Sequence, residues 1–379
     1  MTRITANWIK SDSAQRVCRM LTEAGHQAWF VGGCVRNALI GAPVSDLDLS
    51  TDAKPDKVLH LAEAAGLKAI PTGIDHGTVT VVVDGQPFEI TTFRKDVDTD
   101  GRRATVAFAD SMADDARRRD FTMNALYADP QGNVADPLGG LPDLLARRVR
   151  FIEDADERIR EDYLRILRFF RFHAWYGDPA NGIDADGLAA CAANVEGIAT
   201  LSRERIGQEM VKLLSAPDPA PALAAFAATG GLAQAVPGAT AASLAPLVHL
   251  EKMLALEPDP MRRLAVIGGI NAADRLRLSN AQARHMAIFQ EYGLPAKAAY
   301  HHGREVGRGV LAVLAALMER PVDPDVLAAV DRAEGQMFPV RAEDLMDRYQ
   351  GRALGEKLHE LEDLWCGSGF TLTKDDLIG

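Results

Sequence analysis

Cysteine is scarce in this chain of 379 residues, and none of it stands in a metal-binding or disulfide spacing. The four cysteines, Cys18, Cys34, Cys191 and Cys366, lie far apart without a Cys-x-x-Cys pair. No histidine cluster has the spacing of metal ligands. This pattern is typical of reduced thiols in a cytosolic protein rather than zinc ligands or disulfide bridges.

Long apolar runs are also missing, since no stretch reaches the roughly 18 residues that a membrane helix needs. The first 15 residues lack the apolar core of a signal peptide. We therefore expect a cytoplasmic protein without a membrane partner. The 47% apolar and 25% charged residues exclude disordered and collagen-like chains, and the length suggests two or three domains.

Basic residues are fewer than acidic ones, 42 against 53, which gives a formal charge of −11. That balance argues against indiscriminate nucleic-acid binding, because phosphate backbones favour basic surfaces. Positive charge is nevertheless concentrated locally. Residues 94–119 contain seven bases, and residues 147–171 contain eight arginines beside six acids.

The composition and the predicted secondary structure of the chain change near residue 150. Before it, short β-branched runs predict strands at 28–31, 46–50, 78–83 and 88–93, and Asp84-Gly85-Gln86-Pro87 predicts a hairpin turn between the last two. After it, Ala, Leu, Arg and Glu predominate, and Pro and Gly break the sequence at 177–179, 217–221, 258–260 and 321–324. We expect this second part to be all-helical, divided into bundles of a few helices each.

The first candidate site is Val31-Gly32-Gly33-Cys34-Val35-Arg36, between a predicted strand and a short helix that ends near Gly41 and Pro43. Glycines let a backbone approach a ligand, and a helix N-terminus offers N–H groups to phosphate. A tight turn without ligand explains the segment equally well when it is taken alone. A Rossmann turn is disfavoured because Gly-x-Gly-x-x-Gly is absent.

The second candidate is Asp46-Leu47-Asp48-Leu49. In a strand, both carboxylates project from one face and both leucines from the other. Adjacent carboxylates resist joint ionisation unless a cation separates them, and Mg²⁺ takes one or two carboxylates with phosphate and water. An exposed strand edge is the alternative. Glu89 either faces solvent or joins such a site from a neighbouring strand.

Two arginine-rich segments follow. The first begins like a solvated loop but continues with residues that are unusual for a loop: Arg117-Arg118-Arg119-Asp120-Phe121-Thr122-Met123-Asn124-Ala125. Between residues 94 and 117, a polar stretch that contains Gly101-Arg102-Arg103 predicts a mobile loop beside the site. In residues 161–172, a polar side chain recurs every third residue, which predicts one stripe along a helix: Asp162, Arg165, Arg168 and Arg171. The stripe is either an ion-paired surface or the wall of a cleft.

Taken in order, these motifs resemble the class II tRNA nucleotidyltransferase and bacterial poly(A) polymerase family. The resemblance covers residues 26–215, including Asp136-Pro137-Leu138-Gly139-Gly140 and Ser202-Arg203-Glu204-Arg205-Ile206; beyond these only the helical character agrees. It implies an α+β fold: a polymerase-β-like nucleotidyltransferase head with a mixed sheet at 1–150, a helical neck at 151–215, and a helical body and tail at 216–379 that bind tRNA.

The family chemistry is attack of an RNA 3′-hydroxyl on the α-phosphate of a nucleoside triphosphate. The resemblance implies Asp46 and Asp48 as ligands of Mg²⁺, with Glu89 as a third catalytic acid. Asp162 and Arg165 would read the base: a carboxylate accepts and a guanidinium donates, which matches cytosine and adenine and rejects uracil and guanine. The implied nucleotide-binding set is Gly32, Gly33, Arg36, Arg119, Asp120, Asn124, Asp162, Arg165, Arg168 and Arg171.

The leading hypothesis is addition of C, C and A to the 3′ end of tRNA from CTP and ATP, favoured by Gly73-Ile74-Asp75-His76-Gly77-Thr78-Val79. The alternatives are a poly(A) polymerase, an enzyme that adds only C or only A, a catalytically silent RNA-binding scaffold and a nicotinamide-dependent enzyme. One departure from the family is Asn37, where Asp is usual. No histidine is followed by Asp, so we expect no accompanying phosphohydrolase activity. Nothing in the sequence specifies an oligomeric state.

Overall fold

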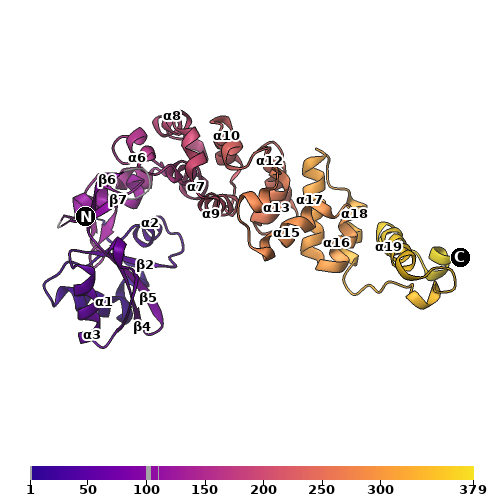
Figure 1. The fold of residues 1–379 in the computed structure, drawn as a ribbon, viewed down its shortest axis with the longest axis horizontal. Helices are drawn as coiled ribbons and strands as arrows, with labels where there is room; N and C mark the ends of the chain where they lie inside the picture. The colour runs from indigo at the N-terminus through magenta and orange to yellow at the C-terminus, as the bar shows by residue number, and fades with distance from the viewer. Residues whose placement is uncertain (1, 100–103, 110) are drawn as a thin grey trace. The chain divides into compact units, whose positions relative to one another are not determined.

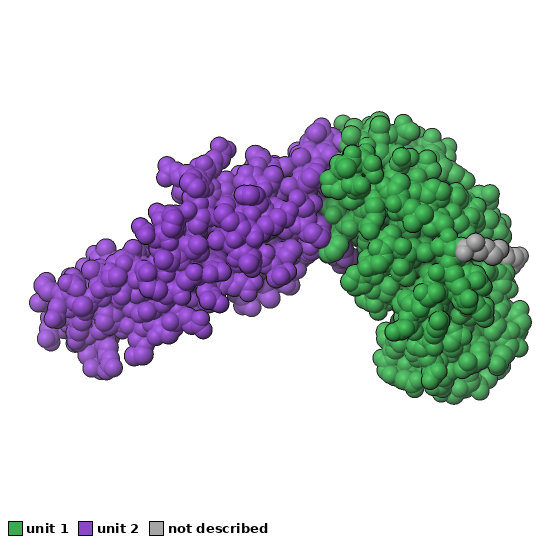
Figure 2. All heavy atoms as spheres, turned by 180° about the vertical axis from the view of Figure 1, so that it is seen from behind, with its two compact units in different colours: residues 1–197 green, residues 198–379 purple. Residues whose placement is uncertain are grey.

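The computed structural model describes residues 2–99, 104–109 and 111–379. The chain divides into two compact units, residues 1–197 and 198–379 (Figures 1 and 2). Each unit is described by itself below.

A mixed sheet of seven strands forms the centre of the first unit, in the order β3-β4-β5-β2-β1-β8-β9. The β2–β5 pair is parallel and the other pairs are antiparallel. The strands are β1 (Trp29–Val31), β2 (Leu47–Thr51), β3 (Lys68–Gly73), β4 (Thr78–Val83), β5 (Gln86–Thr92), β8 (Tyr127–Ala128) and β9 (Val134–Ala135). The four predicted strands and the turn at Asp84 and Gly85 are confirmed.

Residues of β2 alternate between the core and the opposite face, as the sequence predicted. Leu47 and Leu49 are buried, whereas Asp46 is exposed and Asp48 is half-buried. The parallel register sets Asp48 opposite Glu89 of β5. Because side chains at paired positions project from the same face, the register brings these two acids together from strands about 40 residues apart.

The prediction of a loop between residues 94 and 117 was wrong for most of that stretch. Residues 94–99 and 104–108 form a separate antiparallel pair, β6 (Arg94–Thr99) and β7 (Ala104–Phe108), and α4 (Met112–Arg117) follows. The polar residues of β6 concealed one strand, and the two strands pair with each other rather than with the central sheet. Gly101-Arg102-Arg103, for which mobility was predicted, lies outside the described residues.

The remaining elements of the first unit are helical and connect or flank the strands. They are η1 (Asn7–Lys10), α1 (Asp12–Thr22), α2 (Gly33–Leu39), α3 (Pro55–Ala64), η2 (Ile74–His76), η3 (Thr122–Asn124), α5 (Leu141–Leu145), α6 (Ala155–Glu161), α7 (Leu164–Tyr176), η4 (Pro179–Asn181), α8 (Ala185–Ala193) and η5 (Val195–Thr200), whose last residues extend past the unit boundary.

The predicted helical stripe at 162–171 is correct except at its first residue. Asp162 lies in extended backbone between α6 and α7, and its Oδ1 accepts a hydrogen bond from the Leu164 N–H at 3.1 Å. A short carboxylate competes with the helix for backbone donors in this way, which is why the helix starts after it. Arg165, Arg168 and Arg171 are half-buried on α7, while its leucine, isoleucine and phenylalanine residues are buried.

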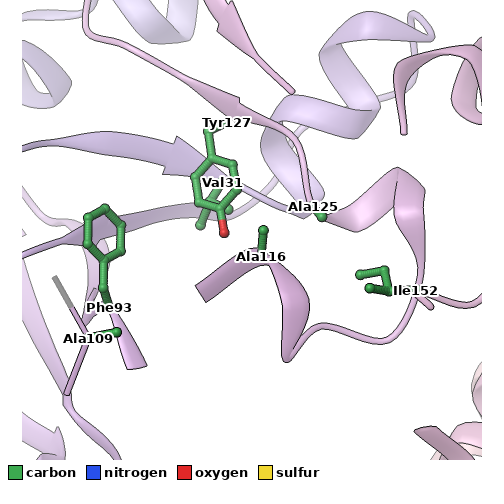
Figure 3. Packing of buried hydrophobic residues seen from close by; sticks show 7 residues of the cluster. All are labelled: Val31, Phe93, Ala109, Ala116, Ala125, Tyr127 and Ile152. Atoms are coloured by element: carbon green, nitrogen blue, oxygen red, sulfur yellow. The ribbon is translucent and has the colours of Figure 1, made fainter. Parts of the chain in front are cut away.

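Seven buried residues form a core cluster between the sheet, α4 and the segment after β9, and Figure 3 shows how they lie. The cluster is Val31, Phe93, Ala109, Ala116, Ala125, Tyr127 and Ile152. The Tyr127 ring stands among these apolar side chains with its hydroxyl directed towards Ala116 on α4 (Figure 3). This core therefore fixes α4 against β1 and β8.

The second unit is helical throughout, as the sequence predicted. Its helices are α9 (Arg203–Leu214), α10 (Ala220–Ala228), α11 (Gly231–Ala235), α12 (Leu244–Met253), α13 (Pro260–Ile267), α14 (Ala272–Arg275), α15 (Asn280–Glu291), α16 (Pro295–His302), α17 (Arg304–Leu317), α18 (Pro324–Arg332), η6 (Ala342–Asp344), α19 (Gly351–Gly367) and α20 (Lys374–Ile378). Pro260 and Pro324 stand at the first helical position, where proline is tolerated.

A buried ion cluster crosses the core of the second unit. Glu251 of α12 accepts hydrogen bonds from the side chains of Arg262 and Arg263 on α13 at 2.8 Å. Arg263 also donates to the carbonyl groups of Leu214, the last residue of α9, and of Ala216 just after it. Buried charges are tolerated only when they are paired in this way, so the cluster ties three helical segments together. No described helix is long and apolar enough to cross a membrane.

Candidate active site

A cavity of about 210 Å³ opens at the face of β2 and β5 that carries the acids. Three arginines line it together with these acids, so it brings both signs of charge to one place. Its lining is Val31, Asp48, Leu49, Ser50, Thr78, Glu89, Thr91, Arg94, Arg118 and Arg119. Of the predicted site residues, the cavity therefore joins Asp48, Glu89 and Arg119.

Asp48 is the acid most affected by this environment. Burial, together with the charges of Glu89 and Asp46, raises its pKa to about 6, although Arg119 opposes the shift. A carboxyl with a raised pKa is one whose negative charge is not fully compensated by its surroundings. A cation near Asp48 would supply that compensation.

The donor set fits a magnesium ion held by few protein ligands. Asp46 is exposed one residue before β2, with Oδ2 accepting a hydrogen bond from the Ser45 hydroxyl at 2.9 Å. Among the described residues, no three His, Cys, Asp or Glu side chains converge as a ready-made metal cage. Mg²⁺ takes one or two carboxylates and completes its shell with water and phosphate, so the Asp46 and Asp48 pair suffices.

Gly32 allows Arg119 to approach the backbone of the turn between β1 and α2. Gly32 has φ +70° and ψ −121°, a conformation that residues with a side chain rarely adopt. A Cβ at this position would also lie 3.4 Å from Nη1 of Arg119. The glycine at this position of the motif therefore serves both the turn and the close contact with arginine.

Asp115 holds two of the three consecutive arginines, and the sequence analysis missed it. Its carboxylate is fully buried and accepts hydrogen bonds from Arg118 at 2.9 Å, Arg119 at 3.1 Å and the Tyr127 hydroxyl at 2.8 Å. Burial raises the pKa of Asp115, but Arg119, Arg118 and Tyr127 outweigh it and bring the pKa down to about 2. The spacing of three and four residues to Arg118 and Arg119 on a helix was the available signal.

Arg36 lies inside the protein, 6% exposed, rather than in the cavity. Its guanidinium donates to Oδ1 of Asn124 at 2.6 Å, to Oδ1 of Asn37 at 2.9 Å and to the Tyr176 hydroxyl at 2.8 Å. Asn37 in turn donates from Nδ2 to the Pro43 carbonyl at 2.7 Å. The departure at Asn37 thus gives a side chain that both accepts from Arg36 and closes the turn after α2.

Asp120 and Asn124 continue this buried contact towards α7. One carboxylate oxygen of Asp120 accepts hydrogen bonds from Nδ2 of Asn124 at 2.8 Å and from the Phe121 N–H at 2.9 Å. The other oxygen accepts a hydrogen bond from Nε of Arg168 at 2.7 Å. Burial raises the pKa of Asp120, but Arg168 and the other donors outweigh it and lower the pKa. Arg36, Asn124, Asp120 and Arg168 are therefore one connected group.

Arg165 and Arg171 occupy other parts of the α7 stripe. Arg165 forms an ion pair with Glu161 and donates to the Arg158 carbonyl at 2.7 Å and the Arg118 carbonyl at 3.2 Å. The Arg171 guanidinium lies 4.5 Å from the centre of the Phe172 ring. Arg165 thereby joins α7 to the cavity through Arg118.

A larger cavity of about 780 Å³ lies elsewhere in the first unit, between α6, α8 and the segment around Phe151, and no predicted site residue lines it. Two of its acids cap helices: Asp154 accepts from the N–H of Glu157 and Asp184 accepts from that of Gly187. These carboxylates are already committed to helix termini, so size alone does not make this cavity the active site.

Comparison with known proteins agrees with the class that this geometry indicates. Residues 28–150 match the Poly A polymerase head domain, and residues 182–243 match a domain described as the probable RNA and SrmB-binding site of polymerase A. The mixed sheet, the turn at Gly32 and the paired acids of β2 belong to a polymerase-β-like nucleotidyltransferase head, which confirms the predicted fold.

Relatives at higher coverage define the family. The mitochondrial CCA tRNA nucleotidyltransferase 1 of Mus musculus is 30% identical over 97% of this chain and 89% of its own length. The chain therefore belongs to the CCA-adding tRNA nucleotidyltransferase family. The CCA-adding enzyme of Geobacillus thermodenitrificans is 42% identical, but the match spans 59% of this chain and about half of that relative, 54%.

A solved structure supports the same assignment. The CCA-adding enzyme of Bacillus stearothermophilus, crystallised with CTP, superposes with a TM-score of 0.72 at 28% identity and covers 94% of this chain and 92% of its own. The Thermotoga maritima CCA-adding enzyme, at 17% identity and a TM-score of 0.68, shares the fold.

Replacing Gly32 with alanine should destabilise the protein more than replacing Gly25, which also has a positive φ of +83° but has nothing within 4 Å of its Cβ position. Both changes place a side chain at a positive φ, but Gly32 also has ψ −121°, outside the left-handed helical region that other residues can adopt, while its added Cβ would only touch Nη1 of Arg119 at 3.4 Å. We therefore expect a difference of about 1 kcal/mol in unfolding free energy, mainly from the backbone. The Arg119 Nε–H resonance should shift only in Gly32→Ala. Equal losses and an unmoved resonance would contradict the contact.

Asp115→Asn should lower stability in a pH-dependent manner. The pKa of Asp115 falls from 3.8 in the unfolded chain to about 2 in the folded protein. The ionised carboxylate therefore stabilises the folded state by about 2 kcal/mol; this stabilisation is fully present above about pH 5 and is lost as the pH falls towards 2. Calorimetry from pH 8 to pH 3 should show a gap to wild type that is constant above pH 5 and narrows below about pH 4. The exposed Asp56, replaced by Asn, is the control; a gap independent of pH would refute the ion pairing.

Proposed function

We propose that this chain adds C, C and A to the 3′ end of tRNA, using CTP and ATP, by attack of the RNA 3′-hydroxyl on the α-phosphate. One observation carries the proposal: in a chain of this family, Asp48 and Glu89 face Arg119 across a single cavity. Acids that bind a metal and cations that bind phosphate are the two requirements of phosphoryl transfer.

The roles of the residues follow from their positions. Asp46 and Asp48 would hold Mg²⁺, which would activate the attacking hydroxyl and neutralise the triphosphate. Arg118 and Arg119, fixed by Asp115, would meet the phosphates. Because Asp115 already fixes both guanidinium groups, they need little rearrangement when the negative substrate arrives.

Base choice would belong to Asp162 and Arg165 at the start of α7. Arg165 has five N–H donors, and its described contacts with Glu161 and the carbonyls of Arg158 and Arg118 use three of them. Donors therefore remain for a base. The Asp162 carboxylate accepts from the Leu164 N–H at 3.1 Å and would supply the acceptor for the base.

The architecture suggests how the rest of the chain would serve this reaction. We assign residues 1–150 to catalysis, 151–215 to base recognition and 216–379 to tRNA binding. We place the reaction in the cytoplasm. Poly(A) polymerase activity and partial addition of C or A remain the alternative reactions, and a silent RNA-binding scaffold is the alternative of another class.

Incubating the protein with Mg²⁺, a tRNA that lacks its 3′ end and one labelled triphosphate at a time tests the reaction. We expect incorporation of C, then of A once C is present, and no incorporation of U or G. Long A-tails on arbitrary RNA would identify a poly(A) polymerase instead. Incorporation of C alone would reduce the function to CC addition.

Asp46→Ala and Asp48→Ala should each lower the rate of transfer by more than 1,000-fold, on the order of 4 kcal/mol, because the metal loses a ligand. Binding of tRNA in a filter assay should stay within about twofold, since neither acid belongs to the region assigned to tRNA. Asp56→Ala, an exposed acid on α3, is the matched control and should transfer normally. Undiminished transfer in both site variants would refute the metal assignment.

A further inference from the structure

A chain of buried and partly buried hydrogen bonds crosses the first unit from α2 to α7. It runs from Asn37 to Arg36 on α2, to Asn124 of η3, to Asp120 and finally to Arg168 on α7. Arg36, Asp120 and Asn124 are each less than 10% exposed. The side chains at the two ends therefore cannot move independently without breaking a buried contact.

Tyr176, in the last turn of α7, closes this chain into a loop. Its hydroxyl accepts a hydrogen bond from Nη2 of Arg36 at 2.8 Å, and its ring centre lies 4.0 Å from the Arg36 guanidinium carbon. The Phe172 ring lies 5.2 Å from the same carbon. Helix α7 thus contacts α2 directly through Tyr176 and indirectly through Arg168 and Asp120.

The acceptors that surround Arg36 make Tyr176 important. The described hydrogen bonds of its guanidinium go to the amide oxygens of Asn37 and Asn124 and to the Tyr176 hydroxyl, all of them neutral. A buried guanidinium held by neutral acceptors depends on each of them, because a lost partner leaves a charged donor unsatisfied. The aromatic faces add a cation–π attraction that a smaller side chain cannot replace.

We propose that Tyr176 is a positioning residue: it holds Arg36, and together with Asn124, Asp120 and Arg168 it sets the distance between the turn at Gly32 and Gly33 and the helix that carries Arg165. This proposal rests on the proposed function, in which Arg165 reads the base, and on the expectation that the turn at Gly32 and Gly33 contacts the rest of the nucleotide. A fixed spacing leaves room for a base in one orientation only, so Tyr176 contributes to nucleotide affinity and to base discrimination.

Tyr176→Phe removes only the hydroxyl, and Tyr176→Leu removes the ring as well. We expect Tyr176→Phe to raise the KM for CTP three- to tenfold with kcat within about twofold, because one hydrogen bond to a buried charge is lost. Tyr176→Leu should raise KM more and should lower the preference for CTP over UTP by threefold or more. If the Tyr176→Leu variant does not fold, the KM of the Tyr176→Phe variant alone tests the proposal.

The matched control is Thr92→Val, which removes one buried hydrogen bond, from the Thr92 hydroxyl to the Ala53 carbonyl at 2.6 Å, away from the chain of contacts. It should lose stability but keep the wild-type KM and base preference. If Tyr176→Phe instead behaves like Thr92→Val, with a lower Tm and an unchanged KM, Tyr176 is only a structural residue and the proposal is wrong.

Coupling within the chain of contacts gives a second measurement. Asp120→Asn weakens the other end of the loop, so the double variant with Tyr176→Phe should raise KM less than the product of the two single effects. Independent, multiplicative effects would show that the two residues do not act through one path and would overturn the proposal.

Titration calorimetry of CTP with the full chain, without tRNA, separates this proposal from the proposed function. Weaker CTP binding by Tyr176→Phe supports the positioning role even if the wild type fails to complete CCA. Equal CTP affinity of wild type and Tyr176→Phe overturns it even if the wild type adds CCA normally.

Discussion

Two buried carboxylates, Asp115 and Asp120, fix the segment between α4 and η3, and the candidate site depends on them. A buried charge persists only when oppositely charged or hydrogen-bonding groups compensate it. Asp115 meets this requirement with Arg118, Arg119 and Tyr127, all beside the sheet. Asp120, only five residues later, meets it with Arg168 and Asn124 on the side of α7. One short segment is thereby held from both sides, so the arginines of the cavity and the helix that carries Arg165 share a single support.

Local patterns predicted most of the elements, because strand alternation and proline breaks are properties of neighbouring residues. The burial of Leu47 and Leu49 and the helix starts at Pro260 and Pro324 follow from such patterns. Pairing between distant strands does not. The sequence left Glu89 between two interpretations, and only the parallel register of β2 with β5 sets it beside Asp48. The β6–β7 pair was missed for a related reason: β6 is mostly polar and shows no core-facing alternation, and β7, although apolar, is only five residues long and pairs with a strand that local pattern does not reveal.

The motif residues are of two physical kinds that a sequence alone does not separate. Asp48 and Arg119 line a cavity, where we propose that they meet the substrate. Arg36, Asp120 and Asn124 bond to one another inside the protein, so the resemblance that implied nucleotide contact for them also fits a supporting role. Asn37 illustrates the distinction. An Asp at that position would still accept from Arg36, but it could not donate to the Pro43 carbonyl as the Asn37 amide does.

The charge of the whole chain gives little guide to the charge of the site, since most basic side chains near it are already paired. Arg118 and Arg119 are held by Asp115, Arg168 by Asp120 and Arg165 by Glu161. Asp48 keeps a raised pKa despite the arginines nearby, mainly because it is buried and faces Glu89. We propose that a cation bound at these acids compensates their charge when a triphosphate is held in the cavity. Asp46 and Asp48 would hold that divalent cation, and Arg118 and Arg119 would meet the phosphates of the same substrate.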